Sequence, residues 1–389
     1  MIKRDIQTLI QKQLKKGKSL LILGPRQVGK TTIVKTFNTN IEINLATNSE
    51  RLKYEKTPEL LTQKVLAHKK KPLVYIDEIQ RVPALFNEIQ VLLDEGKAQF
   101  ILTGSSARKL RSDIDQNLIP GRLINLRMDV ISTHEQESTI QEILSFGQLP
   151  RILNEHEDAQ KSLELRSYVE NYLDEEIRKE TRIRQMAPFI RFIELAAIQS
   201  GKVTNFSEIS KELGPTIPTV QNYYKMLEDT LIVDRIDPYL KNASRKKLTK
   251  SSKYLFFDLG VRRIAAGESQ TFLPDRKGDL FEHLVGNEIL KWIRSHAHDV
   301  KLYFWRDPDG PEVDWIVQHE NRLLPIEVKL KTSPKESDAK HLATFMSEYS
   351  SAKLAWVVCN SENCYQLNKS VKVVPFSQLH FELTKWFNK

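Results

Sequence analysis

One octapeptide near the N-terminus constrains the fold more than any other feature of the chain. It reads Gly24-Pro25-Arg26-Gln27-Val28-Gly29-Lys30-Thr31 and fits the phosphate-loop pattern G-x-x-x-x-G-K-[ST]. An apolar segment at 20–23 precedes it and residues 32–35 can open a helix, which is the setting that the motif requires. Glycines let backbone N–H groups turn toward phosphates, and a helix N-terminus adds partial positive charge.

The motif assigns roles to individual side chains. Lys30 is predicted to reach the β- and γ-phosphates of a nucleotide, and the Thr31 hydroxyl is predicted to bind Mg²⁺. The expected nucleotide-binding residues are Gly24, Pro25, Arg26, Gln27, Val28, Gly29, Lys30, Thr31 and Thr32.

Two further apolar segments end in polar residues. Leu73–Ile76 runs into Asp77 and Glu78, which predicts a Mg²⁺ ligand at Asp77 and a residue that orients or deprotonates the attacking water at Glu78. The segment 100–102 runs into Thr103, Gly104 and Ser105. A strand between the loop and the acidic strand would let Thr103, or alternatively Ser105, orient the water; simple turn chemistry explains the same residues.

Phosphoryl transfer also benefits from an arginine that neutralises the transition state, in cis or in trans. Arg108, Arg111 and Arg122 follow the third of these strands, and Arg122 is the choice because it directly precedes the apolar segment 123–126. A homo-oligomer would supply such an arginine in trans.

Apolar strands alternate with helical stretches over the first 130 residues. Strands are expected at 20–23, 41–45, 73–76, 100–103 and 123–126, after an amphipathic helix at 2–16. This alternation predicts an α/β domain with a mostly parallel sheet. The expected domains are a P-loop core at 1–130, a helical lid or linker at 131–190, a winged-helix section at 191–274 and a C-terminal α/β domain at 275–389.

Three segments carry a family resemblance. Gly24–Thr32 (GPRQVGKTT), Ile76–Gln80 (IDEIQ) and Ile101–Ser106 (ILTGSS) resemble the prokaryotic AAA-type ATPases that join this module to a C-terminal domain of unknown function. Phe146–Pro150 (FGQLP) is similar to the family's FGGLP element, with Gln148 replacing a glycine. The resemblance covers nearly the whole chain and implies an AAA-like ATPase using ATP and Mg²⁺, a winged-helix section and a nuclease-like tail.

The middle of the chain has the order of a winged helix. A first helix at 207–213 ends at Gly214, a second spans 216–227, and a strand begins at 231. A recognition helix would direct Thr219, Gln221, Asn222 and Lys225 toward a groove, with a basic wing at 245–250. Such modules also serve as protein contacts, and two tyrosines on the second helix resemble core residues.

Acidic residues recur in the C-terminal region. Glu282 lies on a helix expected to open at Asp279, Asp314 begins one strand, and Glu327 and Lys329 lie two residues apart on the next, so they share a face. This set resembles the PD-(D/E)XK nuclease superfamily, in which the carboxylates of Glu282, Asp314 and Glu327 would hold a metal and Lys329 would neutralise charge. The same fold also occurs as an inactive scaffold.

Charge and composition favour one class of partner. The net charge is +9, from 59 basic and 50 acidic residues among 389, which suits nucleic acid. Two cysteines make no disulfide framework, and no apolar run or signal core predicts membrane insertion, so a soluble cytoplasmic protein is expected. The leading hypothesis is an ATPase acting on DNA. The alternatives are an ATP-dependent switch that binds proteins and an ATP-regulated, metal-dependent nuclease.

Overall fold

The chain folds into two compact units. The structure, a computed structural model, describes residues 2–106, 122–172, 186–240, 251–270, 274–296, 299–307 and 310–388. The first unit comprises Met1–Ile131 with Asp229–Leu231, and the second comprises Ser132–Glu228 with Ile232–Lys389. Each unit is described by itself below. None of the described helices combines the length and the apolar character needed to cross a membrane.

A parallel sheet forms the centre of the first unit. Its strands, in the order β2-β3-β4-β1-β5, are β1 (Ser19–Leu23), β2 (Ile41–Asn44), β3 (Leu73–Asp77), β4 (Gln99–Gly104) and β5 (Leu123–Arg127). All neighbouring pairs are parallel. The predicted parallel α/β sheet is therefore confirmed, and β4 lies between β1 and β3.

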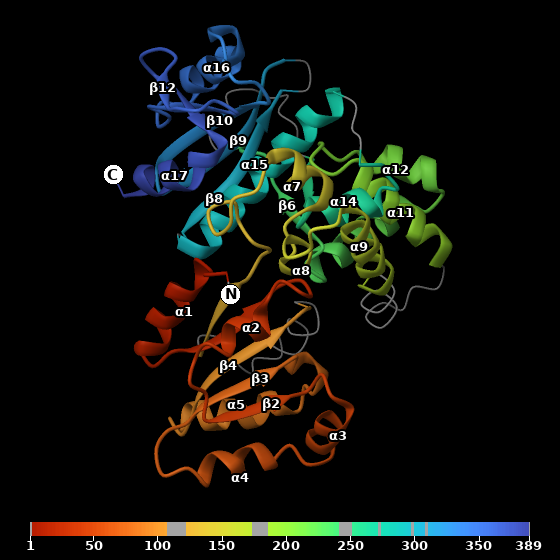
Figure 1. The fold of residues 1–389 in the computed structure, drawn as a ribbon, viewed down its shortest axis with the longest axis vertical. Coiled ribbons are helices and arrows are strands. Elements are labelled where there is room, and N and C mark those ends of the chain that lie inside the picture. Colours follow the sequence, from red (N-terminus) through yellow and green to blue (C-terminus); the bar gives the residue numbers. More distant parts are fainter. Residues whose placement is uncertain are drawn as a thin grey trace. The chain divides into compact units, whose positions relative to one another are not determined.

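Helices cover both faces of this sheet. They are α1 (Ile6–Lys15), α2 (Lys30–Val34), α3 (Asn48–Lys56), α4 (Leu60–Leu66) and α5 (Leu85–Asp94), with a 3₁₀ turn, η1 (Ile79–Arg81). Buried side chains of α3, α4 and α5 pack on one face, formed by residues such as Ile43, Val74 and Leu102. Figure 1 shows α2 on the other side of the sheet from α4 and α5. The predicted N-terminal helix begins at Ile6 rather than at residue 2, because the buried Arg4 side chain donates to the carbonyls of Val28 and Asp129 and fixes the preceding chain.

The first half of the second unit is mostly helical, as expected from the charged, strand-poor sequence after residue 131. Its elements are α7 (Ile140–Phe146), α8 (Pro150–Leu153), α9 (Asp158–Tyr172), α11 (Met186–Ile198), α12 (Phe206–Leu213), α13 (Ile217–Asp229), β6 (Val233–Ile236), β7 (Lys253–Phe256) and α14 (Leu259–Ala265). β6 and β7 form a two-stranded antiparallel sheet. Tyr223 and Tyr224 on α13 pack edge-on against Phe189 and Phe192 respectively, so they are core residues.

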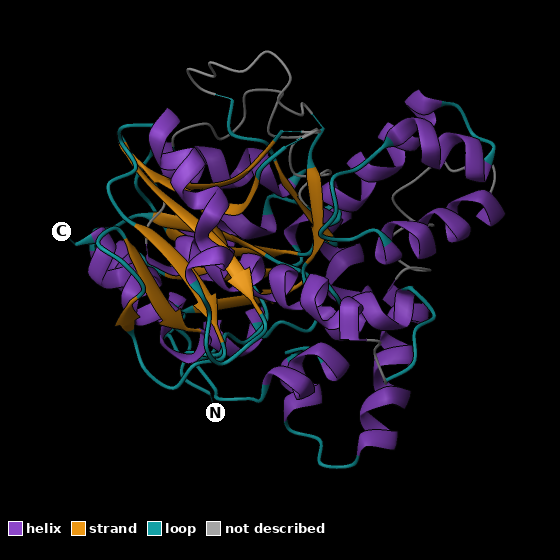
Figure 2. Cartoon of the chain, turned by 90° about the horizontal axis from the view of Figure 1, so that it is seen from above, coloured by secondary structure: helices purple, strands orange, loops and turns teal. Residues whose placement is uncertain are grey.

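A six-stranded mixed sheet forms the second half of this unit (Figure 2). Its elements are α15 (Pro274–His296), β8 (Val300–Arg306), β9 (Glu312–His319), β10 (Arg322–Lys329), η3 (Glu336–Ala339), α16 (Lys340–Glu348), β11 (Ala355–Cys359), β12 (Tyr365–Gln366), β13 (Val371–Pro375), η4 (Phe376–Gln378) and α17 (Leu379–Phe387). The strand order is β12-β13-β11-β10-β9-β8. Helices α15 and α17 pack on one face and α16 on the other. Helix α15 begins at Pro274, earlier than the predicted Asp279, because proline suits the first turn of a helix.

The Phe146–Pro150 element is locked in place by a buried carboxylate. Gly147 has φ 70° and ψ −156°, a conformation that only glycine adopts readily. The buried Asp258 side chain caps α14 by accepting from the Val261 N–H at 2.9 Å, and it also accepts from the Gln148 N–H at 2.6 Å. A Cβ at residue 147 would overlap with that carboxylate. The glycine is therefore required here, whereas Gln148 uses its side chain to accept from Lys291 Nζ at 2.6 Å.

Candidate functional site

The predicted phosphate loop connects the end of β1 to α2. The backbone at Gly29 has φ 99° and that at Gln27 has φ 60°, so two loop residues are in the left-handed region before the helix begins at Lys30. The Lys30 ammonium is buried and donates to the carbonyl oxygens of Gly24 and Pro25, both at 2.8 Å. Helix α2 has only five residues, so few peptide dipoles are aligned behind the loop.

Three of the predicted residues meet at the carboxyl end of the sheet. Asp77, at the end of β3, accepts from Thr31 Oγ1 at 2.9 Å through Oδ2 and from Thr103 Oγ1 at 2.5 Å through Oδ1. The sheet order explains this, because β4 lies next to β3 and the loop follows β1 on its other side. Oxygen atoms of Thr31 and Asp77 are thus adjacent, and the Thr103 hydroxyl is directed at Asp77.

Tyr75 is a neighbour that the sequence pattern did not single out. It is two residues before Asp77 on β3 and so lies on the same face of the sheet, where it is buried. Burial and the negative charge of Asp77 raise the pKa of the Tyr75 hydroxyl above its usual value. The tyrosine therefore stays neutral and lies next to Thr31 and Asp77.

Glu78 is directed toward a second polar group. Its backbone is left-handed, with φ 55° and ψ 47°, which is uncommon for a residue with a side chain and often marks a functional position. Its Oε2 atom accepts from Gln80 Nε2 at 2.5 Å and from Ser105 Oγ at 3.0 Å. The structure thus separates the two candidate hydroxyls, with Thr103 on Asp77 and Ser105 on Glu78. Gln80 was missed, although the IDEIQ segment contained it.

The structure does not bring Arg122 to this site. Strand β5 is parallel to β1, with Leu123 opposite Ser19 and Arg127 opposite Leu23. Arg122 thus lies just before the start of the strands, six residues in register from Gly24, or about 20 Å along the sheet at a rise of ~3.3 Å per residue. It is paired with Asp94, at 2.5 Å from Nε to Oδ1 and 3.0 Å from Nη2 to Oδ2. As an arginine finger in cis, Arg122 was the wrong choice. Arg108 and Arg111 lie outside the described residues.

The second unit brings together all four residues of the predicted acidic constellation. Asp314 on β9 accepts from the backbone N–H of Val328 at 2.7 Å, which ties it to β10. Glu327 on β10 accepts from Lys329 Nζ at 2.7 Å through Oε1, whereas its buried Oε2 atom has no hydrogen-bond partner among the described residues. Glu282 on α15 completes the group, and the Trp315 indole N–H donates to its backbone carbonyl at 3.1 Å.

Crowded carboxylates change the acidity of this group. Burial raises the pKa of Asp314 well above its usual value, and Glu282 and Glu327 raise it further. Burial likewise raises the pKa of Glu327 to about 7, although Lys329 opposes this.

A lysine that the sequence did not suggest lies within the same group. Lys253 is on β7, 2% exposed, and its Nζ atom is 2.7 Å from Glu282 Oε1 and 3.2 Å from Glu312 Oε1. The ammonium also lies 5.0 Å from the centre of the Phe304 ring and 5.1 Å from that of Trp315. No local pattern marks Lys253, because its burial depends on contacts with segments more than 25 residues away in the chain, Glu282 being the nearest.

The predicted recognition helix, α13, presents a polar face to solvent. Gln221, Asn222 and Lys225 are exposed and Thr219 is half-buried, while the tyrosines on the opposite side are core residues. The predicted basic wing at 245–250 lies outside the described residues.

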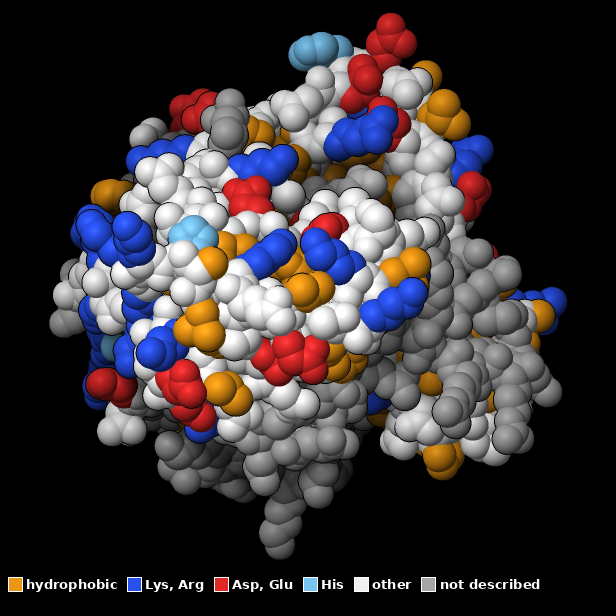
Figure 3. Space-filling view, turned by 90° about the horizontal axis from the view of Figure 1, so that it is seen from below, with side chains coloured by type: hydrophobic (Ala, Val, Ile, Leu, Met, Phe, Trp, Pro, Cys, Tyr) orange, Lys and Arg blue, Asp and Glu red, His pale blue; other side chains and the backbone are white. Residues whose placement is uncertain are grey.

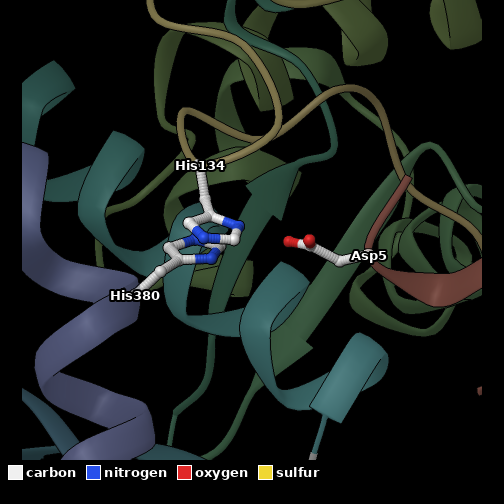
Figure 4. Close-up of side chains that lie close together, drawn as sticks. All are labelled: Asp5, His134 and His380. Carbon is white, nitrogen blue, oxygen red and sulfur yellow. The ribbon is translucent and has the colours of Figure 1, made fainter. Parts of the chain in front are cut away.

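A buried polar cluster lies between α15 and α17. Glu288 accepts from His380 Nε2 at 2.9 Å, from Lys291 Nζ at 2.7 Å and from the Thr133 N–H at 3.0 Å. Figure 4 shows His134 stacked on His380, with ring centres 5.6 Å apart and an angle of 11° between planes; Asp5, also drawn, belongs to the first unit. Burial alone would raise the pKa of Glu288, but Lys291 and His380 outweigh it and hold the pKa well below its usual value.

Comparison with known proteins divides the chain into three matched regions. Residues 16–137 match the family described as "AAA domain". Residues 137–271 match "Domain of unknown function (DUF8612)" and residues 277–379 match "Domain of unknown function (DUF4143)". The expected pairing of an AAA-type module with a C-terminal domain of unknown function is confirmed.

Relatives of the whole chain are themselves uncharacterized. The proteins Rv2008c of Mycobacterium tuberculosis and Mb2031c of Mycobacterium bovis are each 23% identical over 385 residues, which covers 97% of this chain and 84% of the relative. Among solved structures, the replication initiator DnaA bound to AMPPCP and single-stranded DNA is 13% identical, covers 59% of this chain and 90% of its own, and has a TM-score of 0.30. That score is too low to support any conclusion. The chain thus carries an AAA domain of the P-loop ATPase type, followed by two domains of unknown function.

Proposed function

We propose that the first unit hydrolyses ATP at the carboxyl end of its parallel sheet. The contact that carries the proposal is the 2.9 Å hydrogen bond between Thr31 Oγ1 and Asp77 Oδ2. It pairs the last hydroxyl of the phosphate-loop motif with the carboxylate that ends β3. In this proposal Lys30 binds the phosphates, Glu78 orients the attacking water, and residues 24–32 form the nucleotide loop.

The chemistry of the donor set fits Mg²⁺. Thr31 and Asp77 offer hard oxygen ligands, which Mg²⁺ prefers, and few of them, which suits an ion that keeps several waters. When bound, Mg²⁺ would neutralise charge on the phosphates. Thr103 would hold Asp77 in one orientation through its 2.5 Å hydrogen bond, so we assign it a positioning role rather than contact with the water.

Lys30 and Glu78 are each held by groups that a substrate could replace. The two carbonyl oxygens bonded to Lys30 would be exchanged for phosphate oxygens, which are stronger acceptors for an ammonium. Ser105 and Gln80 hold the Glu78 carboxylate through the same oxygen, Oε2. Glu78 Oε1 is therefore the atom that we propose receives the proton of the attacking water.

The site assignment is tested by steady-state ATP hydrolysis of Glu78→Gln. Because a general base contributes ~10²–10⁴-fold, kcat should fall by at least about 100-fold while ATP binding persists. Glu95→Gln is the matched control, since this glutamate is exposed at the end of α5 in the same unit. If Glu78→Gln hydrolysed ATP at the normal rate, the assignment would fail; if it lost ATP binding, Glu78 would be structural.

We further propose that the ATPase acts on DNA. The net charge of +9 and the exposed Gln221, Asn222 and Lys225 of α13 support a partner with phosphates and hydrogen-bonding bases. The face drawn in Figure 3 bears Lys and Arg interspersed with Asp and Glu, so that face offers no continuous basic surface. The proposal therefore rests on α13 rather than on that face.

The DNA proposal is tested by measuring ATP hydrolysis with duplex, branched and single-stranded DNA over a range of salt concentration. Stimulation that falls steeply with salt supports a DNA-directed ATPase. Hydrolysis that no DNA alters would refute it and favour the ATP-dependent switch that binds proteins. Changing Gln221, Asn222 and Lys225 together to Ala should weaken binding without altering hydrolysis in the absence of DNA.

A further inference from the structure

The C-terminal acidic cluster, which we define as Glu282, Glu312, Asp314 and Glu327, already contains a cation. We propose that the ammonium of Lys253 is its resident cation and takes the place that a divalent metal would occupy. The inference concerns the second unit and is independent of the proposed ATPase. It assigns to this cluster a role in joining β7 to α15 and β9, not in metal-dependent cleavage.

The surroundings of the Lys253 ammonium suit an amine rather than a metal ion. Carboxylate oxygens of Glu282 and Glu312 lie at 2.7 and 3.2 Å, distances typical of ammonium hydrogen bonds and ion pairs. The rings of Phe304 and Trp315 lie about 5 Å away, where a cation is attracted to the aromatic face. Mg²⁺ and Mn²⁺ need oxygen ligands in an octahedron, and ring carbons provide none.

The lysine cannot leave the cluster easily. Its backbone lies opposite Ile236 in the β6–β7 pair and forms a further bridge with Val203. Its side chain is 2% exposed, so withdrawal of the ammonium would require β7 to separate from its neighbours. Lys253 is therefore a fixed part of the cluster and not a group that an incoming ion displaces.

Fixed positive charge beside the cluster also disfavours a metal. Lys329 pairs with Glu327 at 2.7 Å, so two lysines already accompany the four carboxylates. A divalent ion would have to enter beside two fixed positive charges in a buried site, where like charges repel strongly. The orphan oxygen Glu327 Oε2, which lacks a hydrogen-bond partner among the described residues, is one atom that a metal would have used. With Lys253 in place, the carboxylates of Glu282 and Glu312 already have an ammonium beside them.

The test compares the number of Mn²⁺ ions bound by full-length wild type and by Asp314→Asn, measured by electron paramagnetic resonance without nucleotide. We expect equal numbers, because the cluster binds no Mn²⁺ while Lys253 is present. Any ion held by the first unit is common to both proteins and cancels. Loss of one bound ion in Asp314→Asn would overturn the proposal, because it would show that the cluster holds metal beside Lys253.

A second variant tests the exchange of one cation for another. Lys253→Met keeps an unbranched apolar side chain over the rings and removes the charge. It should gain one Mn²⁺ site, and Lys253→Met/Asp314→Asn should lose that site again. A folded Lys253→Met protein that gains no Mn²⁺ site would overturn the exchange. If Lys253→Met fails to fold, the comparison of wild type with Asp314→Asn still decides whether the cluster holds metal.

Discussion

The replacement Gly147→Ala should destabilise the second unit far more than an ordinary glycine substitution. Gly147 has φ 70° and ψ −156°, which costs a residue with a side chain ~1–3 kcal/mol. The new Cβ would also displace the Asp258 carboxylate. That carboxylate accepts from two backbone N–H groups, at 2.6 and 2.9 Å, and bonds to a charged acceptor are worth ~1.5–3 kcal/mol each.

These contributions predict a loss of about 4–6 kcal/mol, since terms that share one side chain do not add fully. Gly214→Ala is the matched control in the same unit. Its φ is also positive, at 90°, but no atom lies within 4 Å of the position that a Cβ would occupy. It should therefore cost only ~1–2 kcal/mol, the price of the left-handed backbone.

Urea unfolding followed by tryptophan fluorescence measures this difference directly. All five tryptophans, at 292, 305, 315, 356 and 386, belong to the second unit, so the signal reports on that unit alone. Equal losses in the two variants would refute the reasoning, because only Gly147 meets Asp258. Gly147→Ala combined with Asp258→Ala should lose less than the sum of the single changes, since the overlap is then absent.

Three further outcomes follow from the described contacts. Thr103→Val should raise the Mg²⁺ concentration needed for half-maximal ATP hydrolysis by about 10–100-fold, because a hydrogen bond to a charged group is worth ~1.5–3 kcal/mol. Thr103→Ser, which keeps the hydroxyl, should need the same Mg²⁺ concentration as the wild type. If Thr103→Val needed no more Mg²⁺ than the wild type, the positioning role of Thr103 would be refuted. Arg122→Ala should leave kcat unchanged at fixed protein concentration, and a loss of 10-fold or more would mean that Arg122 reaches a nucleotide in another subunit. Because the pKa of Glu288 is lower in the folded protein than its unfolded value of ~4.3, the ionised carboxylate stabilises the fold above that pH, and this stabilisation is lost as the pH falls below it. In Glu288→Gln, the free energy of unfolding measured by tryptophan fluorescence should therefore fall less between pH 5 and 2 than in the wild type.

The nucleotide site could be predicted because its residues follow strands of one parallel sheet. Each strand is a short apolar run, and the side chains that matter lie at the ends of β3 and β4 and in the loop that follows β1. Since parallel strands end at the same edge, Thr31, Asp77 and Thr103 had to be neighbours once the strand order was known. The same rule excludes Arg122, which precedes its strand and so lies at the opposite edge. That error was avoidable from the sequence.

Lys253 could not be predicted in the same way. It lies in a short strand, KYLF, whose pattern gives no reason to expect a buried ammonium. Its partners come from α15, β8 and β9, and they meet only when the two-stranded and six-stranded sheets pack together. A buried charge is stable only with partners, so its presence is a property of the tertiary structure.

The two acidic sites of this chain differ in how their carboxylates are satisfied, and this difference argues for different chemistry. Asp77 is bonded only to hydroxyls of Thr31 and Thr103 in the contacts described above, so its negative charge is not neutralised by them. In the C-terminal acidic cluster, by contrast, Lys253 and Lys329 neutralise Glu282 and Glu327 at 2.7 Å each. A divalent ion gains most where a carboxylate keeps its charge and has neutral oxygen neighbours. Divalent-metal dependence of this protein should therefore reside in Asp77, so that Asp77→Asn abolishes it and Asp314→Asn does not.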